Sequence, residues 1–181
     1  MRKPLLILSL VGLLTAAFVA PAAAARPDDA GRPTLLSRAL AINAETGEFS
    51  TLISIAGQYP GILEALSGKQ QLTLFAPTDA AFANLVTLLD SLGLELGDLS
   101  SAQIATVLTY HVLPGRYSAD RLSGQTSLTM FSGEIASVSA NGGVRINDAN
   151  VIIADVAASN GFIHAIDSVL LPPSILAALA G

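Results

Sequence analysis

Hydrophobic positions change their spacing along the chain, from a helical pattern in the first part to a strand pattern in the last. Up to about residue 111, apolar side chains recur mostly three and four residues apart, as on one face of a helix. Helices are predicted from Thr34 to residue 46, over 48–59, over 62–66 after Pro60-Gly61, from Thr78 onward and over 101–110. One strand is predicted among them at 72–76, and Pro77 ends it.

From Thr126 the spacing of apolar residues becomes two, which is typical of strands. Strands are predicted over 126–131, 134–140, 144–147, 151–156 and 162–171. Helices come first and strands last, without the regular alternation of a doubly wound sheet. This order predicts an α+β fold.

The last two runs form the most informative stretch. Both are rich in Val and Ile, which fit a pleated sheet, and Ser159-Asn160-Gly161 between them supplies turn residues. They are predicted to form a hairpin near the centre of the sheet. Alternation places Phe162, His164 and Ile166 on one face, and Ile163, Ala165 and Asp167 on the other. Asp155 adds a further polar group to the first strand. A buried His164 must be hydrogen-bonded, and a structural role is expected for it.

Two helix starts carry capping signals. Thr78 is placed to cap the helix that follows the first strand, Asp79 favours its positive end, and Phe82 continues the apolar face. Ser100 and Gln103 have the spacing of a capping box. These local signals explain Asp79 without a catalytic role.

The N-terminus resembles a secretory signal peptide. Arg2 and Lys3 precede an apolar run from residue 5 to 20, and small residues follow up to Ala25. Cleavage after Ala25 is expected, with Ala24 as the second choice, so residues 1–25 would be removed and 26–33 would form a mobile leader. A membrane anchor is the alternative, but the run is shorter than the about 20 residues that span a bilayer. A secreted or periplasmic protein without membrane insertion after cleavage is predicted.

Composition excludes several classes of function. The chain has 9 Lys and Arg against 14 Asp and Glu, a net charge of −5, and the loss of Arg2 and Lys3 makes it more acidic. This balance argues against nucleic acid and anionic lipid as partners. With no cysteine and two histidines, and without a calcium or phosphate loop, no metal and no cofactor are expected.

Three segments in order resemble the fasciclin domain, the β-Ig-H3/fasciclin family. They are 73–82 (TLFAPTDAAF), the pair Tyr110-His111, and 160–173 (NGFIHAIDSVLLPP). The resemblance covers residues 34–173 and leaves 174–181 as a C-terminal tail. It implies a β-wedge of about seven strands with helices packed on it, and an extracellular adhesion or matrix-binding role. Phe162 and Ala165 stand where the family more often has Val, which affects local packing only.

The resemblance also suggests a candidate adhesion edge, formed by Tyr110 and His111 with flanking Leu108 and Leu113. A core position of His111 is the favoured alternative, because Ile104, Val107, Leu108 and His111 share one helix face. Tyr110 is expected to point outward, beside the turn at Pro114-Gly115. The other motif residues are expected to be structural: Thr78, Asp79, Phe82, Asn160, Gly161, His164 and Asp167.

No catalytic residue is predicted. Ser159, His164 and Asp167 contain the residue types of a triad, but they are too close in sequence and lack a nucleophile elbow. The preferred function is a non-enzymatic adhesion module for a cell-surface or matrix protein or a polysaccharide. The alternative is a soluble carrier or sensor of a small apolar ligand. An adhesion surface predicts exposed apolar residues on one edge, and a carrier predicts an enclosed apolar pocket. The sequence predicts no oligomeric state.

Overall fold

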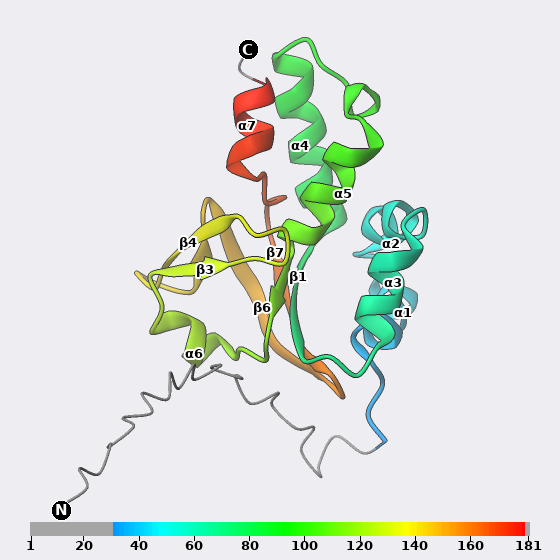
Figure 1. The fold of residues 1–181 in the computed structure, drawn as a ribbon, viewed down its shortest axis with the longest axis vertical. Helices are drawn as coiled ribbons and strands as arrows, with labels where there is room; N and C mark the ends of the chain where they lie inside the picture. Colours follow the sequence, from blue (N-terminus) through cyan, green and yellow to red (C-terminus); the bar gives the residue numbers. More distant parts are fainter. Residues whose placement is uncertain (1–30, 180–181) are drawn as a thin grey trace, which may run out of the picture.

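A computed structural model describes residues 31–179 of the chain, which form a seven-stranded sheet with helices packed against it (Figure 1). The helices are α1 (Leu35–Thr46), α2 (Ser50–Ala56), α3 (Pro60–Ser67), α4 (Asp79–Ser91), the 3-10 helix η2 (Leu96–Asp98), α5 (Ser101–Tyr110), α6 (Ala119–Ser123) and α7 (Pro173–Leu179). The strands are β1 (Leu72–Pro77), β2 (Val112–Pro114), β3 (Ser127–Thr129), β4 (Ile135–Ser139), β5 (Arg145–Ile146), β6 (Ala149–Ala158) and β7 (Gly161–Ile166). The predicted α+β class and seven-stranded sheet are confirmed.

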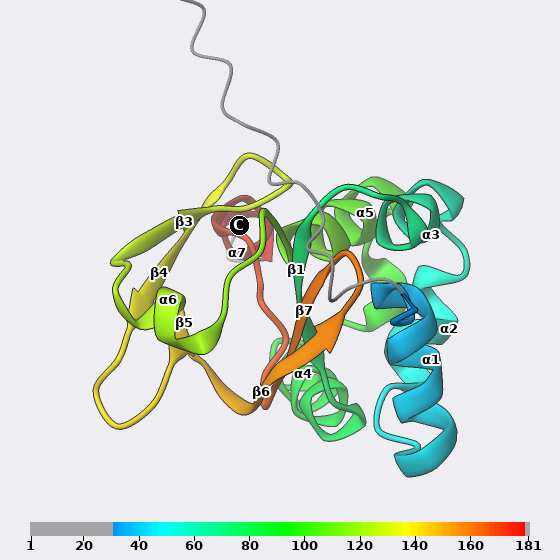
Figure 2. The same ribbon diagram turned by 90° about the horizontal axis from the view of Figure 1, so that it is seen from below.

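The strand order is β2-β1-β7-β6-β5-β4-β3. Strands β1 and β7 pair in parallel, from Leu72 opposite Gly161 to Pro77 opposite Ile166, and the other neighbours are antiparallel. Strands β6 and β7 form the expected hairpin near the centre of the sheet. Helices α1–α3 lie on one side of β1 and β7, and β3–β5 lie on the other, in both views (Figures 1 and 2).

Two apolar cores form on opposite faces of β1 and β7. Ile163 and Ala165 join the core beneath α1, α2, α3 and α5, whereas Phe75 and Ile166 join the core between β1, β7 and the strands β3–β6. This division follows the alternation predicted for β7. Burial on both faces explains why β1 is fully apolar apart from Thr73.

The second strand of the hairpin is shorter than predicted. The expectation extended it to Leu171, but β7 ends at Ile166. Beyond that point the backbone leaves the sheet, and the Leu170 N–H donates to the His111 ring at 2.9 Å instead of to a strand. The partner strand β6 contains register shifts between Val151 and Val156, with Asp155 at a positive φ of 58°.

Several elements were not predicted. Val112–Pro114, expected as the approach to a turn, pairs with β1 as the edge strand β2, and α6 was missed. Residues 174–181 were expected to be a tail, but helix α7 covers most of them and buries Ile175. The predicted signal peptide, 1–25, and most of the leader lie outside the described residues. Within the leader, the Pro33 oxygen accepts a hydrogen bond from Ser159.

Candidate functional site

The tyrosine of the Tyr-His motif is a core residue. Tyr110 ends α5 and is 0% exposed. Its hydroxyl donates to the Ile135 oxygen at 3.0 Å and accepts from the Asn147 side-chain amide at 2.9 Å. Burial raises the Tyr110 pKa, although the hydrogen bond from Asn147 opposes this. The expectation of an outward-pointing Tyr110 is therefore wrong, because the ring fills the core beneath β4 and its hydroxyl already has two hydrogen-bond partners.

His111 is buried beside it. Since the Leu170 N–H must donate to Nε2, at 2.9 Å, the ring proton lies on Nδ1 and is donated to the Val107 oxygen at 2.7 Å. Burial lowers the His111 pKa to about 4, so the ring is neutral at pH 7. Leu108 and Leu113 are also buried. All four residues of the candidate adhesion edge thus lie inside the protein, so the expected edge is not exposed.

His164 connects strand β7 to two other segments. Its Nδ1 accepts from the Asp155 N–H at 3.2 Å, and its Nε2 donates to the Tyr117 oxygen at 2.9 Å. The ring stacks on Phe75, with centroids 5.7 Å apart. Burial lowers its pKa. His164 therefore holds the irregular part of β6 and the segment before α6, and both its nitrogens are occupied.

Asn160 and Gly161 organise the turn between β6 and β7. The Asn160 side chain accepts from the Leu35 N–H and donates to the oxygens of Leu66 and Gly68. Gly161 has a φ of 155°, and a Cβ placed there would lie 1.7 Å from the Leu72 oxygen. Only glycine allows β1 to approach this closely.

The remaining motif residues also make structural contacts. Thr78 caps α4 by accepting from the Ala81 N–H at 3.3 Å, and Phe82 packs in the core. Asp79 begins α4 as predicted, but its carboxylate also accepts from the Thr51 N–H at 2.9 Å, in the first turn of α2. Asp167 accepts two hydrogen bonds from Asn150, at 2.7 and 2.8 Å. Partial burial opposes ionisation, yet these bonds outweigh it and lower the Asp167 pKa.

The triad residue types are not brought together as a catalytic site. Both nitrogens of His164 bind backbone groups, and Asp167 binds Asn150, so neither of these two residues is placed to activate Ser159. Among residues 31–179, no three His, Cys, Asp or Glu side chains gather in a way that could hold a metal ion. In the same part of the chain, no helix is long and apolar enough to cross a membrane.

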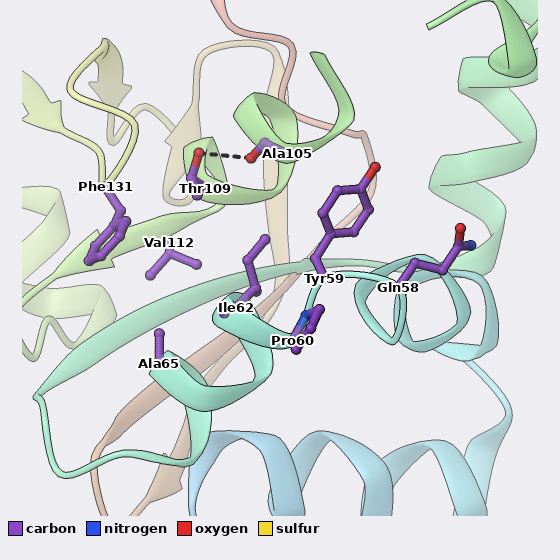
Figure 3. A pocket seen from close by; sticks show the side chains of 10 residues that line it. Gln58, Tyr59, Pro60, Ile62, Ala65, Ala105, Thr109, Val112 and Phe131 are labelled. Carbon is purple, nitrogen blue, oxygen red and sulfur yellow. Dashed lines mark hydrogen bonds between the residues drawn. The ribbon is translucent and has the colours of Figure 1, made fainter. Parts of the chain in front are cut away.

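An open apolar groove of about 350 Å³ lies between α3, α5 and the end of β3 (Figure 3). We call this hollow the α3–α5 groove. It is lined by Gln58, Tyr59, Pro60, Gly61, Ile62, Ala65, Ala105, Thr109, Val112 and Phe131. Sequence reasoning missed it because its walls come from segments up to 73 positions apart. A second apolar hollow, beside Leu108 and His111, has only about 30 Å³, roughly the volume of one water.

Two large apolar side chains are exposed on the β3–β4 hairpin, beside the groove. Phe131 is 44% exposed and Ile135 is 63% exposed. Leu128 of β3 pairs with Ala136 of β4 and both are buried, so alternation places Ile135 on the outer face of the hairpin. Phe131 lies in the turn between the two strands. We call these two residues the hairpin patch. Two hydrogen bonds from the interior hold its backbone. The Tyr110 hydroxyl donates to the Ile135 oxygen at 3.0 Å, and the Phe131 N–H donates to the Val112 oxygen at 2.7 Å.

Comparisons with known proteins agree with the fold. Protein sll1483 of Synechocystis is 41% identical over 134 residues, which are 69% of this chain and 68% of that protein. The cell surface glycolipoprotein MPT83 of Mycobacterium tuberculosis is 33% identical over 114 residues, 62% of this chain and 49% of its own length. The FAS1 domain pair of the insect cell adhesion molecule fasciclin I superposes with a TM-score of 0.60 at 22% identity, over 78% of this chain and 52% of that one. The family model of the fasciclin domain matches residues 47–172, and the chain belongs to that family.

Proposed function

We propose that this protein is a non-enzymatic extracellular binding module, and that the hairpin patch attaches it to a protein of a cell surface or matrix. The observation that carries the proposal is the exposure of two large apolar side chains, Phe131 and Ile135, within five residues of one hairpin. Apolar surface that is exposed and contiguous marks interaction sites on proteins. Relatives named as a cell surface glycolipoprotein and a cell adhesion molecule support the same setting.

A protein partner fits this patch better than a polysaccharide. Aromatic and aliphatic side chains that are held rigidly serve as anchors at protein interfaces, because little conformational entropy is lost when they are covered. Hydrogen bonds hold the backbone at both positions of the patch: the Tyr110 hydroxyl donates to the Ile135 oxygen, and the Phe131 N–H donates to the Val112 oxygen. Neither side chain of the patch can form the hydrogen bonds that sugar hydroxyls require.

The non-enzymatic assignment is supported by the way the titratable groups are used. His111 and His164 each hold two backbone partners and have lowered pKa values, so neither ring is free to transfer protons near pH 7. The proposal includes export, with residues 1–25 removed and a secreted or periplasmic mature protein. The intact mass of the protein isolated from its host should then correspond to a chain that begins at Arg26. A mass that includes the apolar run would indicate an anchored protein.

The test uses the variant Phe131→Ser with Ile135→Ser, and Leu88→Ser as a control. Leu88 is comparably exposed, at 48%, but lies on α4. Each purified protein is immobilised, and the attachment of host cells and of extracted matrix protein is counted. The double variant should lose most attachment with a thermal midpoint close to that of the parent, and the control should retain it.

Two outcomes would contradict the proposal. Attachment that is equal in the double variant and the parent would show that the hairpin patch is not the contact surface. Attachment that is abolished by purified polysaccharide but is insensitive to protease treatment of the cells would replace the protein partner with a sugar.

A further inference from the structure

The α3–α5 groove has the chemistry of a small-molecule site. It shares Phe131 with the hairpin patch, but Ile135 does not line it. Of its ten lining residues, none is charged, although the whole chain has a net charge of −5 and 23 ionisable Lys, Arg, Asp and Glu residues. A lining without charge complements a neutral occupant, because an ion would lose its hydration without gaining a partner. We propose that the groove binds a small neutral apolar molecule that carries a single hydrogen-bonding group.

The size of the groove supports a small molecule. Ligand pockets in proteins range from about 300 to 1,000 Å³, and a hollow of about 350 Å³ lies at the lower end of this range. Its floor is apolar, with Val112 buried and with Ile62 and Ala65 half-buried. Figure 3 shows the Phe131 ring at one end of the groove and the Tyr59 ring toward the other, with Val112 and Ile62 between them. An aromatic ring at each end of the groove favours an apolar ligand that is itself aromatic.

Most polar groups that face the groove are already satisfied. The Thr109 hydroxyl donates to the Ala105 oxygen at 2.9 Å, one turn earlier in α5. The Tyr59 hydroxyl donates to the Ser101 oxygen at 3.2 Å. Gln58 lies beyond Tyr59 and is exposed, so its side-chain amide is the polar group at the mouth of the groove that can bind the polar end of a ligand. Because this amide lies at one end of an otherwise apolar groove, the ligand that fits best has an apolar body with one polar terminus.

Small side chains create the space. Ala65 on α3 and Ala105 on α5 both line the groove, and both are half-buried. A leucine at either position would place its side chain in the volume that a ligand ring needs. Ala102, one turn before Ala105 on α5, is exposed and does not line the groove, so it provides a matched control.

The experiment uses N-phenyl-1-naphthylamine, a neutral aromatic probe with one N–H, whose fluorescence rises in an apolar site. Titration of the full-length protein should give saturable binding at one site. Ala105→Leu should weaken binding by about ten-fold or more, the range found when a pocket is changed by a few methylene groups. Ala102→Leu should leave binding unchanged. Ala65→Leu gives an independent second variant, and thermal midpoints show that each protein is folded.

A second arm tests the polar end. Competition by 1-naphthol should be stronger than competition by naphthalene, and Gln58→Leu should remove the difference. Non-saturable fluorescence, or equal affinity in the parent and in folded Ala105→Leu and Ala65→Leu, would overturn the proposal.

The ligand site and the adhesion surface share Phe131, so their failures are distinguished at residues that belong to only one of them. Ile135 does not line the groove, so Ile135→Ser should reduce attachment and retain probe binding. Ala105→Leu should do the reverse. Loss of both properties in either folded variant would show that the groove and the patch form a single protein-binding surface, which would also overturn the small-molecule assignment.

Discussion

The hydroxyl of Tyr110 donates a hydrogen bond to the backbone oxygen of Ile135, 25 positions later in the chain. This contact joins a fully buried motif residue to one of the most exposed apolar residues of the fold. The Asn147 amide donates to the same hydroxyl and ties in the segment after β5. The Tyr-His motif therefore supports the hairpin patch from inside, and does not itself present a surface to a partner.

Removing the Tyr110 hydroxyl should loosen the hairpin. In Tyr110→Phe the Ile135 oxygen and the Asn147 amide lose their common partner, so the free energy of unfolding should fall by about 1–3 kcal/mol. Tyr110→Ala also leaves a cavity and should cost about 3–5 kcal/mol. Denaturant melts give both values. The matched control is Tyr59→Phe, whose exposed hydroxyl bond should be worth less than about 1 kcal/mol. A Tyr110→Ala protein as stable as the parent would be incompatible with the core position.

Local signals in the sequence predicted most elements of the fold. Thr78 and Ser100 cap α4 and α5 through residues three positions later, and the alternation of β7 divides its side chains between the two cores. Each of these features depends on residues that are close in sequence. The signals are therefore present in the chain before any tertiary contact forms.

The features that were missed depend on distant partners. β7 ends at Ile166 because the chain then turns to meet His111, 59 positions before Leu170. Tyr110 was expected at the surface because it precedes a turn, but β4 covers it. The second role of Asp79, at Thr51 of α2, and the α3–α5 groove likewise need segments brought together by the sheet. Periodicity contains no information about such pairs.

The protein should lose stability in moderately acidic solution. His111 has a pKa of about 4 when folded against about 6.5 when unfolded, because burial disfavours the charged ring. Between these pH values the unfolded chain binds a proton that the folded protein does not. The free energy of unfolding should therefore decrease as the pH falls from 6.5 to 4, by about 3 kcal/mol from this ring alone. Asp167, whose pKa is lowered, stabilises the folded protein above its ordinary pKa. This stabilisation is lost only when the pH falls below that value.

Urea melts at intervals across this range measure the slope. His111→Gln removes the titration and should flatten it, while His164→Gln should remove a separate share, since burial lowers the pKa of that ring as well. A parent protein whose stability is constant from pH 7 to 4 would contradict the buried neutral state of both rings.

Gly161 should not tolerate a side chain. A Cβ at this position would lie 1.7 Å from the Leu72 oxygen, so Gly161→Ala must separate β1 from β7 at the centre of the sheet. The free energy of unfolding should fall by more than about 4 kcal/mol, and the variant should be largely unfolded at about 37 °C. Circular dichroism and thermal melts decide this. Gly142→Ala is the control: it has a φ of 83° and open space around it, so only the backbone cost of about 1–2 kcal/mol applies.

Asn160 should be the residue that attaches two helices to the sheet. Its side chain accepts from the Leu35 N–H at 2.8 Å, in the first turn of α1, and donates to the Leu66 and Gly68 oxygens at 3.0 and 2.9 Å, at the end of α3. These are backbone groups that a helix cannot satisfy by itself. Asn160→Asp keeps the acceptor but places a carboxylate oxygen against two carbonyl oxygens. It should therefore cost about 3 kcal/mol or more, as for a buried charge without a partner.

Hydrogen exchange distinguishes this local role from general destabilisation. In Asn160→Asp the amides of α1 and α3 should exchange faster than those of β3 and β4, because the two helices lose their common attachment while the hairpin keeps its own. Asn150→Ala, which removes one exposed side-chain hydrogen bond to Asp167, should change exchange little in either region. Uniformly faster exchange across all elements in Asn160→Asp would mean that the helices and the sheet unfold as one unit, and the attachment would then have no separate role.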